Sequence, residues 1–287
     1  MMNSLTIDVE DWYNILDSDA VPPIEKWGEL EDRVEPSMDR ILNLLSEANI
    51  KSTFFWLGWT AERHKNLVRR CIEEGHEVAS HGYGHVLAYQ VGRKAFKEDI
   101  VRAKQLLEDI TGTPVVGFRA PGFGITNDTN WAFGEIKAAG YVYDSSVFPT
   151  NRGHGGYLNA PSEPYIMSTS AGDLTEIPMS LVDVFGKKVS LFGGGYLRLA
   201  PIPLIRWGIK KLYQVKQPLI VYLHPREVDP GHPRLPLSAM RRFKCYVNLK
   251  STVPKLRWLT QNYSFIPMRE IAAKVDKTEV LACSDAA

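Results

Sequence analysis

Short apolar runs alternate with amphipathic segments along most of the chain. Leu5–Val9, Ser52–Leu57 and Leu219–Leu223 are apolar or aromatic runs typical of buried strands. Between such runs, apolar residues recur every three or four positions, which predicts helices. The predicted helices are Pro36–Asn49, Ala61–Glu74, Lys94–Asp109, Asn130–Ala139 and Ile202–Tyr213, and the other predicted strands are Glu77–Ser80, Val115–Phe118, Tyr141–Tyr143 and a β-rich stretch at Glu176–Phe192. This alternation predicts an α/β fold with parallel strands.

The carboxyl ends of the predicted strands carry the candidate functional residues. Active sites of parallel α/β folds lie at these strand ends. Here the ends carry Asp8, His81, Arg119 and His224. Because no repeat or low-complexity linker divides the chain, we expect one domain over residues 1–275 and a frayed polar tail at 276–287.

Composition and charge narrow the classes of function. The chain has 287 residues and a formal net charge of +1, which argues against a nucleic-acid-binding protein because such proteins need a basic excess. Cys71, Cys245 and Cys283 are far apart and odd in number, so we expect reduced thiols. No secretory signal and no apolar run of about 18 residues is visible, so the expected location is the cytoplasm.

Two segments contain residue types that bind metals. Asp8, Glu10 and Asp11 place three carboxylates together, and these repel one another unless a cation compensates, although a solvated acidic turn is the simpler interpretation of this segment alone. His81 and His85 are four residues apart, and the glycines between them allow both side chains to reach one metal. A carboxylate with two histidines is a typical ligand set for catalytic zinc, with a position left for water.

Arg119 and His224 could complete such a site. An arginine at a strand end can pair with a carboxylate and keep it ionised, although a structural salt bridge explains Arg119 equally well. A lone histidine at the end of a buried strand is more often structural, but beside a metal His224 would suit a general acid that protonates a leaving amine.

Taken in order, these segments resemble the NodB-homology polysaccharide deacetylases, carbohydrate esterase family four, and above all the branch associated with exosortases and exopolysaccharide loci. The matching segments are Asp8–Trp12, Thr53–Trp59, Gly75–His85, Phe118–Phe123, Tyr143–Pro149 and Tyr222–Glu227. The likeness continues into a C-terminal extension at about 228–275. It implies a distorted, incomplete (β/α) barrel, one divalent metal, zinc foremost, and removal of an N-acetyl group from a sugar of a bacterial surface or extracellular polysaccharide.

The resemblance also implies roles for individual residues. Asp8 matches the general base, Arg119 the residue that holds this base, and His224 the general acid. The metal histidines match His81 and His85. The residues expected to line the substrate pocket are Trp12, Tyr83, Pro121, Asp144 and Arg226.

The chain departs from the family pattern at three positions. Many members have the metal-binding aspartate where Val9 stands here, so the ligand is Glu10, as the spacing favours, or Asp11, as side-chain identity favours. Arg226 replaces a frequent tryptophan and would suit an acidic or phosphorylated substrate. Cys245 stands where the branch often has histidine, with no consequence that we can derive.

Partners and other functions stay open at this point. The helix Ile202–Tyr213 interleaves apolar residues with Arg206, Lys210 and Lys211, so it could rest on the inner membrane surface, but a core-facing helix with solvated cations is the simpler interpretation. The alternatives to sugar N-deacetylation are hydrolysis of a cyclic imide or ureide on the same scaffold and non-catalytic glycan binding. The presence of the full catalytic set favours deacetylation of an N-acetylated glycan. The sequence does not indicate the oligomeric state.

Overall fold

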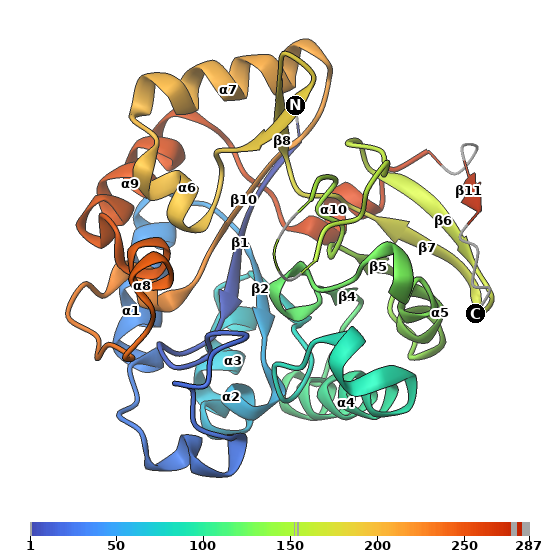
Figure 1. The fold of residues 1–287 in the computed structure, drawn as a ribbon, viewed down its shortest axis with the longest axis horizontal. Helices are drawn as coiled ribbons and strands as arrows, with labels where there is room; N and C mark the ends of the chain where they lie inside the picture. The colour runs from blue at the N-terminus through green and yellow to red at the C-terminus, as the bar shows by residue number, and fades with distance from the viewer. Residues whose placement is uncertain (1, 152, 154, 277–279, 283–287) are drawn as a thin grey trace. The chain divides into compact units, whose positions relative to one another are not determined.

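The computed structural model describes residues 2–151, 153, 155–276 and 280–282 (Figure 1). The chain forms two compact units. Unit 1 consists of Met1–Ser52 and Ser180–Ile266, and unit 2 consists of Thr53–Met179 and Pro267–Ala287. The expected single domain with a C-terminal extension stays a prediction. In the expected tail, residues 277–279 and 283–287 lie outside the described residues.

Unit 1 is built on two parallel strands. β1 (Asn3–Val9) pairs with β10 (Leu219–Leu223), with Leu5 opposite Val221 and Ile7 opposite Leu223. Every residue of both strands is buried, as is typical of strands in a parallel sheet. Both predicted strands are therefore confirmed, and their carboxyl ends lead to the acidic segment and to His224.

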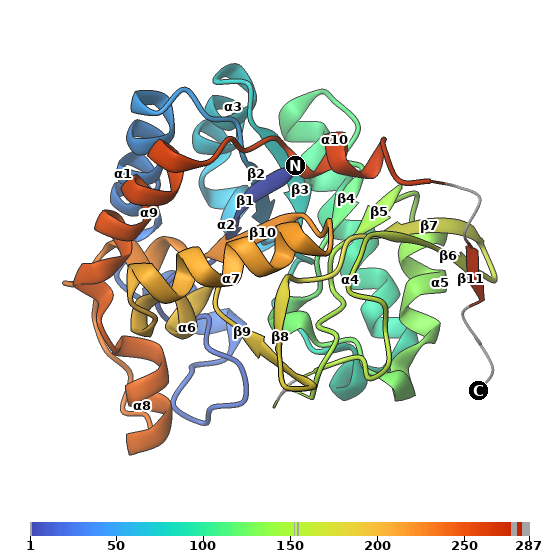
Figure 2. The ribbon, with the colours of Figure 1, turned by 90° about the horizontal axis from the view of Figure 1, so that it is seen from above.

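Helices and a small hairpin complete unit 1. In Figures 1 and 2, α1, α6, α8 and α9 gather on the same side of the strand pair. The elements are η1 (Ile24–Glu29), α1 (Val34–Glu47), β8 (Leu181–Val184), β9 (Lys187–Ser190), α6 (Gly194–Leu199), α7 (Ile202–Gln214), η4 (Pro225–Val228), α8 (Ala239–Tyr246), η5 (Leu249–Ser251) and α9 (Thr252–Asn262). β8 and β9 pair antiparallel.

The sheet of unit 2 runs in the order β2-β3-β4-β5-β7-β6-β11. Neighbouring strands from β2 to β7 are parallel, β6 and β7 form an antiparallel hairpin, and β11 lies parallel to β6. The strands are β2 (Thr53–Trp56), β3 (Glu77–Ser80), β4 (Gly117–Phe118), β5 (Tyr143–Asp144), β6 (Tyr165–Thr169), β7 (Gly172–Glu176) and β11 (Val280–Ala282). The mainly parallel pairing confirms the predicted α/β class.

The helices of unit 2 differ from the predictions in their bounds. The predicted helix Ala61–Glu74 is two helices, because the backbone at His64 leaves the helical region, and α4 has a break at Gly92, where φ is 77°. α4 and α5 pack on each other. The elements are α2 (Gly58–Arg63), α3 (Lys65–Glu73), α4 (Ala88–Thr111), η2 (Pro121–Phe123), η3 (Asn127–Thr129), α5 (Trp131–Ala138) and α10 (Met268–Ala272).

Three successive glycines, Gly193–Gly195, predict a loop after the β-rich stretch, but in the structure Gly193 is the N-cap of α6 and the other two begin the helix. A Cβ atom on Gly193 would lie 2.1 Å from the ring of Tyr222, so this glycine allows the tyrosine ring to pack directly against the backbone. Among the described helices, none combines the length and hydrophobicity that a bilayer span requires.

Candidate functional site

A short loop after β3 presents both candidate metal histidines in unit 2. The Asp99 carboxylate on α4 accepts the backbone N–H groups of Tyr83 at 2.7 Å and Gly84 at 2.8 Å. Gly82 has φ +73°, and a Cβ atom there would lie 2.6 Å from Asp99 Oδ2. Glycine is therefore required at position 82 both by its backbone conformation and by the space available.

The two histidines lie beside each other. The ring centroids of His81 and His85 are 5.6 Å apart, both side chains are buried, and their ligand atoms lie within 4.8 Å of one another. His81 Nδ1 is 2.7 Å from the carbonyl oxygen of Arg119. Because a carbonyl can only accept, Nδ1 carries a proton, and in the neutral ring the lone pair is then on Nε2. This tautomer is the one that a metal ligand needs.

The peptide group between Arg119 and Ala120 joins His81 to a buried acid. While the Arg119 carbonyl accepts from His81, the Ala120 N–H of the same peptide donates to Ser146 Oγ at 2.7 Å. Ser146 Oγ in turn donates to Asp144 Oδ1 at 2.7 Å. All these groups are buried, so the chain of hydrogen bonds polarises the carbonyl that holds His81.

Asp144 and Glu176 form a buried pair of carboxyl groups. Asp144 accepts two hydrogen bonds from Ser146, one from its N–H at 3.0 Å and one from its hydroxyl. Glu176 accepts one, from the Val147 N–H at 3.1 Å. Burial raises the pKa of Glu176 well above its ordinary value, and the nearby charge of Asp144 raises this pKa further. Burial raises the pKa of Asp144 as well, but hydrogen bonds from Glu176 and Ser146 lower it, so Asp144 is the carboxyl group of the pair that ionises first.

Arg119 lies in the core of unit 2. Its guanidinium lies over the ring of Phe55, 4.1 Å from the centroid, and donates to Ser145 Oγ at 3.2 Å. The sulfur atoms of Met179 and Met268 lie 3.8 and 3.7 Å from its Nη2. This packing fixes the direction of the side chain, while its expected role toward a base stays a prediction.

Tyr83 and Pro121, two expected pocket residues, are part of the local packing. The Tyr83 hydroxyl donates to Glu62 Oε2 at 2.7 Å, and Arg102 lies over its ring at 3.3 Å. Pro121 is buried at the start of η2. Contact of Tyr83, Pro121 or Asp144 with a substrate stays a prediction.

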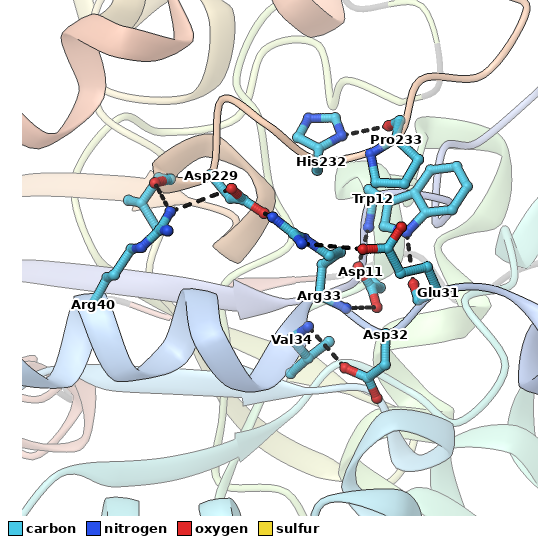
Figure 3. A network of polar contacts seen from close by, with 11 residues as sticks. Asp11, Trp12, Glu31, Asp32, Arg33, Val34, Arg40, Asp229, His232 and Pro233 are labelled. Atoms are coloured by element: carbon cyan, nitrogen blue, oxygen red, sulfur yellow. Dashed lines mark hydrogen bonds and ion pairs between the residues drawn. The ribbon is translucent and has the colours of Figure 1, made fainter.

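In unit 1, the acidic segment after β1 is a folded turn rather than a solvated one. Asp8, Glu10 and Asp11 are all buried. Asp11 Oδ1 accepts the Trp12 N–H at 2.7 Å, and Asp11 Oδ2 accepts the Arg33 N–H at 3.0 Å (Figure 3). Asp11 thus uses both carboxylate oxygens to hold backbone groups.

An ionic network fixes the other side of this turn. Figure 3 shows Arg33 and Arg40 converging on Asp229, with Arg33 Nη2 2.7 Å and Arg40 Nη1 3.3 Å from its carboxylate. The indole N–H of Trp12 donates to the carbonyl oxygen of Glu31 at 2.8 Å. Trp12, an expected pocket residue, is buried here, and its contact with substrate stays a prediction.

Glu10 contacts two basic side chains of unit 1. Arg226 Nη1 donates to Glu10 Oε2 at 2.8 Å, and His224 Nε2 lies 3.7 Å from Glu10 Oε1. The structure therefore brings together three sequence-predicted residues of unit 1. Arg226 here pairs with a carboxylate of its own unit, and its expected contact with an anionic substrate stays a prediction.

Glu227 and Arg198, which sequence reasoning left without a role, hold His224. Glu227 Oε1 lies 2.7 Å from His224 Nδ1, and Arg198 Nη1 lies 3.1 Å from Glu227 Oε2. Burial alone would raise the pKa of Glu227, but the charge of Arg198 and the hydrogen bond from His224 outweigh it and lower this pKa to about 2. The sequence signal for this role was the position of Glu227, three residues after His224. The two side chains also form the capping box of η4.

The expectation of reduced thiols is confirmed for the two cysteines that the structure describes. Cys71 and Cys245 are free thiols. Burial raises the pKa of the Cys71 thiol, so this residue is chemically inert. Cys283 lies outside the described residues.

Two family models match the chain side by side. Residues 29–143 match the family described as polysaccharide deacetylase, and residues 145–273 match a domain of unknown function, DUF3473. The first segment contains His81, His85 and Arg119, and the second contains His224, Arg226 and Glu227.

Named relatives match about a third of the chain. A peptidoglycan-N-acetylglucosamine deacetylase of Bacillus cereus is 33% identical over 94 residues, which are 32% of this chain and 34% of the relative. A peptidoglycan deacetylase of Helicobacter pylori is 27% identical over 113 residues, which are 39% of this chain and 38% of the relative. The chain thus matches little more than a third of the length of these relatives.

Solved structures share the fold over nearly the whole chain. A Mycobacterium smegmatis protein described as a polysaccharide deacetylase has a TM-score of 0.63 at 19% identity, covering 98% of this chain and 93% of its own. The allantoinase Puue has a TM-score of 0.60 at 18% identity, covering 95% and 89%. The predicted fold type is confirmed, and the fold alone does not choose between acetamide and ureide chemistry.

We predict that Glu176→Gln removes a pH-dependent loss of stability. Glutamine matches protonated glutamic acid, since its amide can donate to Asp144 and accept from Val147. A raised pKa means that the folded protein binds this proton more tightly than the unfolded chain, whose ordinary pKa is 4.5. The free energy of unfolding of the wild type should therefore fall as pH rises from about 4.5 to the folded-state pKa, by about 1.4 kcal/mol for each pH unit in that interval.

Urea denaturation at a series of pH values would measure this effect. Glu176→Gln should be at least as stable as the wild type, with a difference that grows as pH rises. Asp144→Asn is the matched control, because its amide would turn a donor toward Ser146 and should destabilise the fold by about 1–3 kcal/mol. Parallel pH profiles of the wild type and Glu176→Gln would contradict the shared-proton assignment.

Proposed function

We propose that this chain, of which residues 29–143 match the polysaccharide deacetylase family, hydrolyses the N-acetyl group of a sugar in a glycan. The observation that carries the proposal is the pair of buried imidazoles, His81 and His85, in the segment that matches the family. The tautomer fixed on His81 leaves Nε2 able to bind a cation. The name of the Bacillus cereus relative, a peptidoglycan-N-acetylglucosamine deacetylase, favours an amino-sugar substrate.

The proposed metal ligands are His81, His85 and Glu10. Two neutral imidazoles and one carboxylate suit zinc and leave a position for water. Glu10 is favoured over Asp11 because the oxygens of Asp11 already hold two backbone N–H groups. A divalent metal, zinc foremost, would supply Lewis acidity toward the acetamido carbonyl and would lower the pKa of a water molecule.

The remaining residues would move protons. Asp8 at the end of β1 is proposed as the base that accepts the proton of the attacking water, with Arg119 keeping it ionised. His224 is proposed as the acid that donates a proton to the departing amine. Glu227 and Arg198 support this role, since a carboxylate on Nδ1 orients the ring and stabilises its protonated form.

The finer biological assignment is part of the same proposal. We propose a substrate from a bacterial surface or extracellular polysaccharide and a place in the exosortase-associated branch of the family. Substrate contact is assigned to Trp12, Tyr83, Pro121, Asp144 and Arg226. A cytoplasmic location is proposed with it.

Acetate release tests the proposed reaction. The protein should release acetate from N-acetylglucosamine oligomers, and prior removal of metal with a chelator should abolish the reaction until zinc is restored. Asp8→Asn should lose about two to four orders of magnitude in rate while keeping its metal. Hydrolysis of a cyclic ureide with no acetate release would instead support the alternative chemistry, and zinc-independent acetate release would refute the metal role.

Comparison of Glu10→Gln with Asp11→Asn should show which of the two acids binds the metal and which stabilises the fold. We expect Glu10→Gln to lower the zinc retained after dialysis, because it removes a charged ligand, and Asp11→Asn to retain zinc but unfold more easily by about 1–3 kcal/mol, because an amide cannot accept both backbone bonds. Elemental analysis and thermal denaturation give both readouts. Zinc loss in Asp11→Asn alone would reverse the assignment.

Glu227→Gln should slow the reaction through His224. We expect kcat to fall about 10-fold to 100-fold with little change in KM, since the uncharged amide no longer stabilises the protonated imidazole. In a His224→Gln background the same substitution should have no further effect on kcat. An equal fall in both backgrounds would show that Glu227 acts only on the fold.

A further inference from the structure

Residues 184–266 of unit 1 carry a pronounced excess of positive charge. They contain fifteen Lys and Arg residues and two acidic residues, whereas the whole chain has a formal net charge of +1. The two acids, Glu227 and Asp229, are buried and paired with Arg198, Arg33 and Arg40. Neither acid therefore offsets the exposed cations of this segment.

Large apolar side chains are exposed among these cations. Trp207 and Leu204 on α7 are 37% and 40% exposed, and Met240 and Phe243 on α8 are 65% and 53% exposed. Single exposed apolar residues are ordinary, but several exposed apolar residues on nearby helices indicate a surface that binds another molecule or a membrane.

The orientation of α7 explains why its apolar residues face outward. Ile205, Gly208, Ile209 and Leu212 form its buried face. A Cβ atom on Gly208 would lie 2.8 Å from Leu191 and 3.2 Å from Val182, so this face packs tightly against the β8–β9 hairpin region. Leu204, Trp207 and Lys211 recur at helical spacing on the face that remains, beside Lys210.

α6 joins this face of α7 to α8. In both Figure 1 and Figure 2, α6 lies between α7 and α8. A Cβ atom on Gly195 would lie 2.9 Å from the Lys244 carbonyl oxygen, which also accepts Arg198 Nη2 at 2.8 Å. Tyr196 and Leu199 of α6 are exposed. The three helices therefore follow one another, and we call their exposed residues together the α6–α8 surface.

We propose that the α6–α8 surface docks on a membrane containing anionic lipids. Lys210, Lys211 and Arg242 would meet the headgroups, while Trp207 and Phe243 would enter the boundary with the acyl chains. A nucleic acid or an acidic glycan would pair with the cations but would leave the aliphatic residues Leu204 and Met240 without a partner. The mixture of exposed aliphatic and cationic side chains thus favours a lipid surface. This inference does not depend on the proposed reaction.

Vesicle co-sedimentation of the full chain tests the proposal. Binding to vesicles of phosphatidylglycerol and phosphatidylcholine should exceed binding to vesicles of phosphatidylcholine alone, and it should weaken as salt rises. Lys210→Glu with Lys211→Glu should lower binding at least about tenfold, because each cation near an anionic surface contributes about fivefold. Leu204→Ser with Trp207→Ser should lower it by a similar factor, through loss of apolar insertion.

Matched variants of unit 2 are the controls. Lys65→Glu with Lys94→Glu makes the same charge change at exposed positions, and Val142→Ser with Leu158→Ser removes exposed apolar side chains. Both should bind vesicles as the wild type does, and all four variants should keep the wild-type melting temperature. Equal binding to both vesicle types, no binding, or equal losses in the controls would overturn the proposal. Binding to heparin that responds to the charge variant, without any vesicle response to the apolar variant, would also overturn it.

Discussion

The hydrogen bonds of one buried peptide group fix the state of His81. The carbonyl of Arg119 accepts the proton on His81 Nδ1, and the N–H of Ala120 is held through Ser146 by the Asp144 carboxylate. Because every member of this chain is buried, an unmade bond would leave a polar group without water or partner. The requirement to satisfy all these groups explains why Asp144 ionises before Glu176.

In each unit, a buried carboxylate supports a candidate site histidine, His81 in unit 2 and His224 in unit 1. In unit 2, a carboxylate acts on His81 through a hydroxyl and a peptide, and in unit 1 Glu227 contacts His224 directly, with Arg198 behind it. The two arrangements differ in the partner of Nδ1, which is a carbonyl oxygen for His81 and a carboxylate for His224. In both, this partner fixes the orientation of the ring, which the proposed roles of ligand for His81 and acid for His224 require.

Much of the fold could be predicted from the apolar pattern. Leu219–Leu223 and Glu77–Ser80 have the bounds that were predicted, because buried parallel strands are short apolar runs with clear ends. The break of one predicted helix at His64 and the hairpin of β6 and β7 were missed, since both depend on tertiary packing that local periodicity does not record. The prediction of a loop at Gly193–Gly195 was wrong because glycine serves close approach as well as turns.

The candidate site could be predicted by residue type but not by role. The sequence left the choice between Glu10 and Asp11 open, and the proposal of Glu10 as the ligand rests on the hydrogen bonds of Asp11 to Trp12 and Arg33. Position 82 is constrained both by the backbone conformation of Gly82 and by the space beside it. A side chain at this position would have to displace Asp99, which holds the next two residues, and would also have to adopt a left-handed backbone. A substitution of Gly82 is therefore expected to disturb the geometry of the histidine pair together with the hydrogen bonds of Asp99.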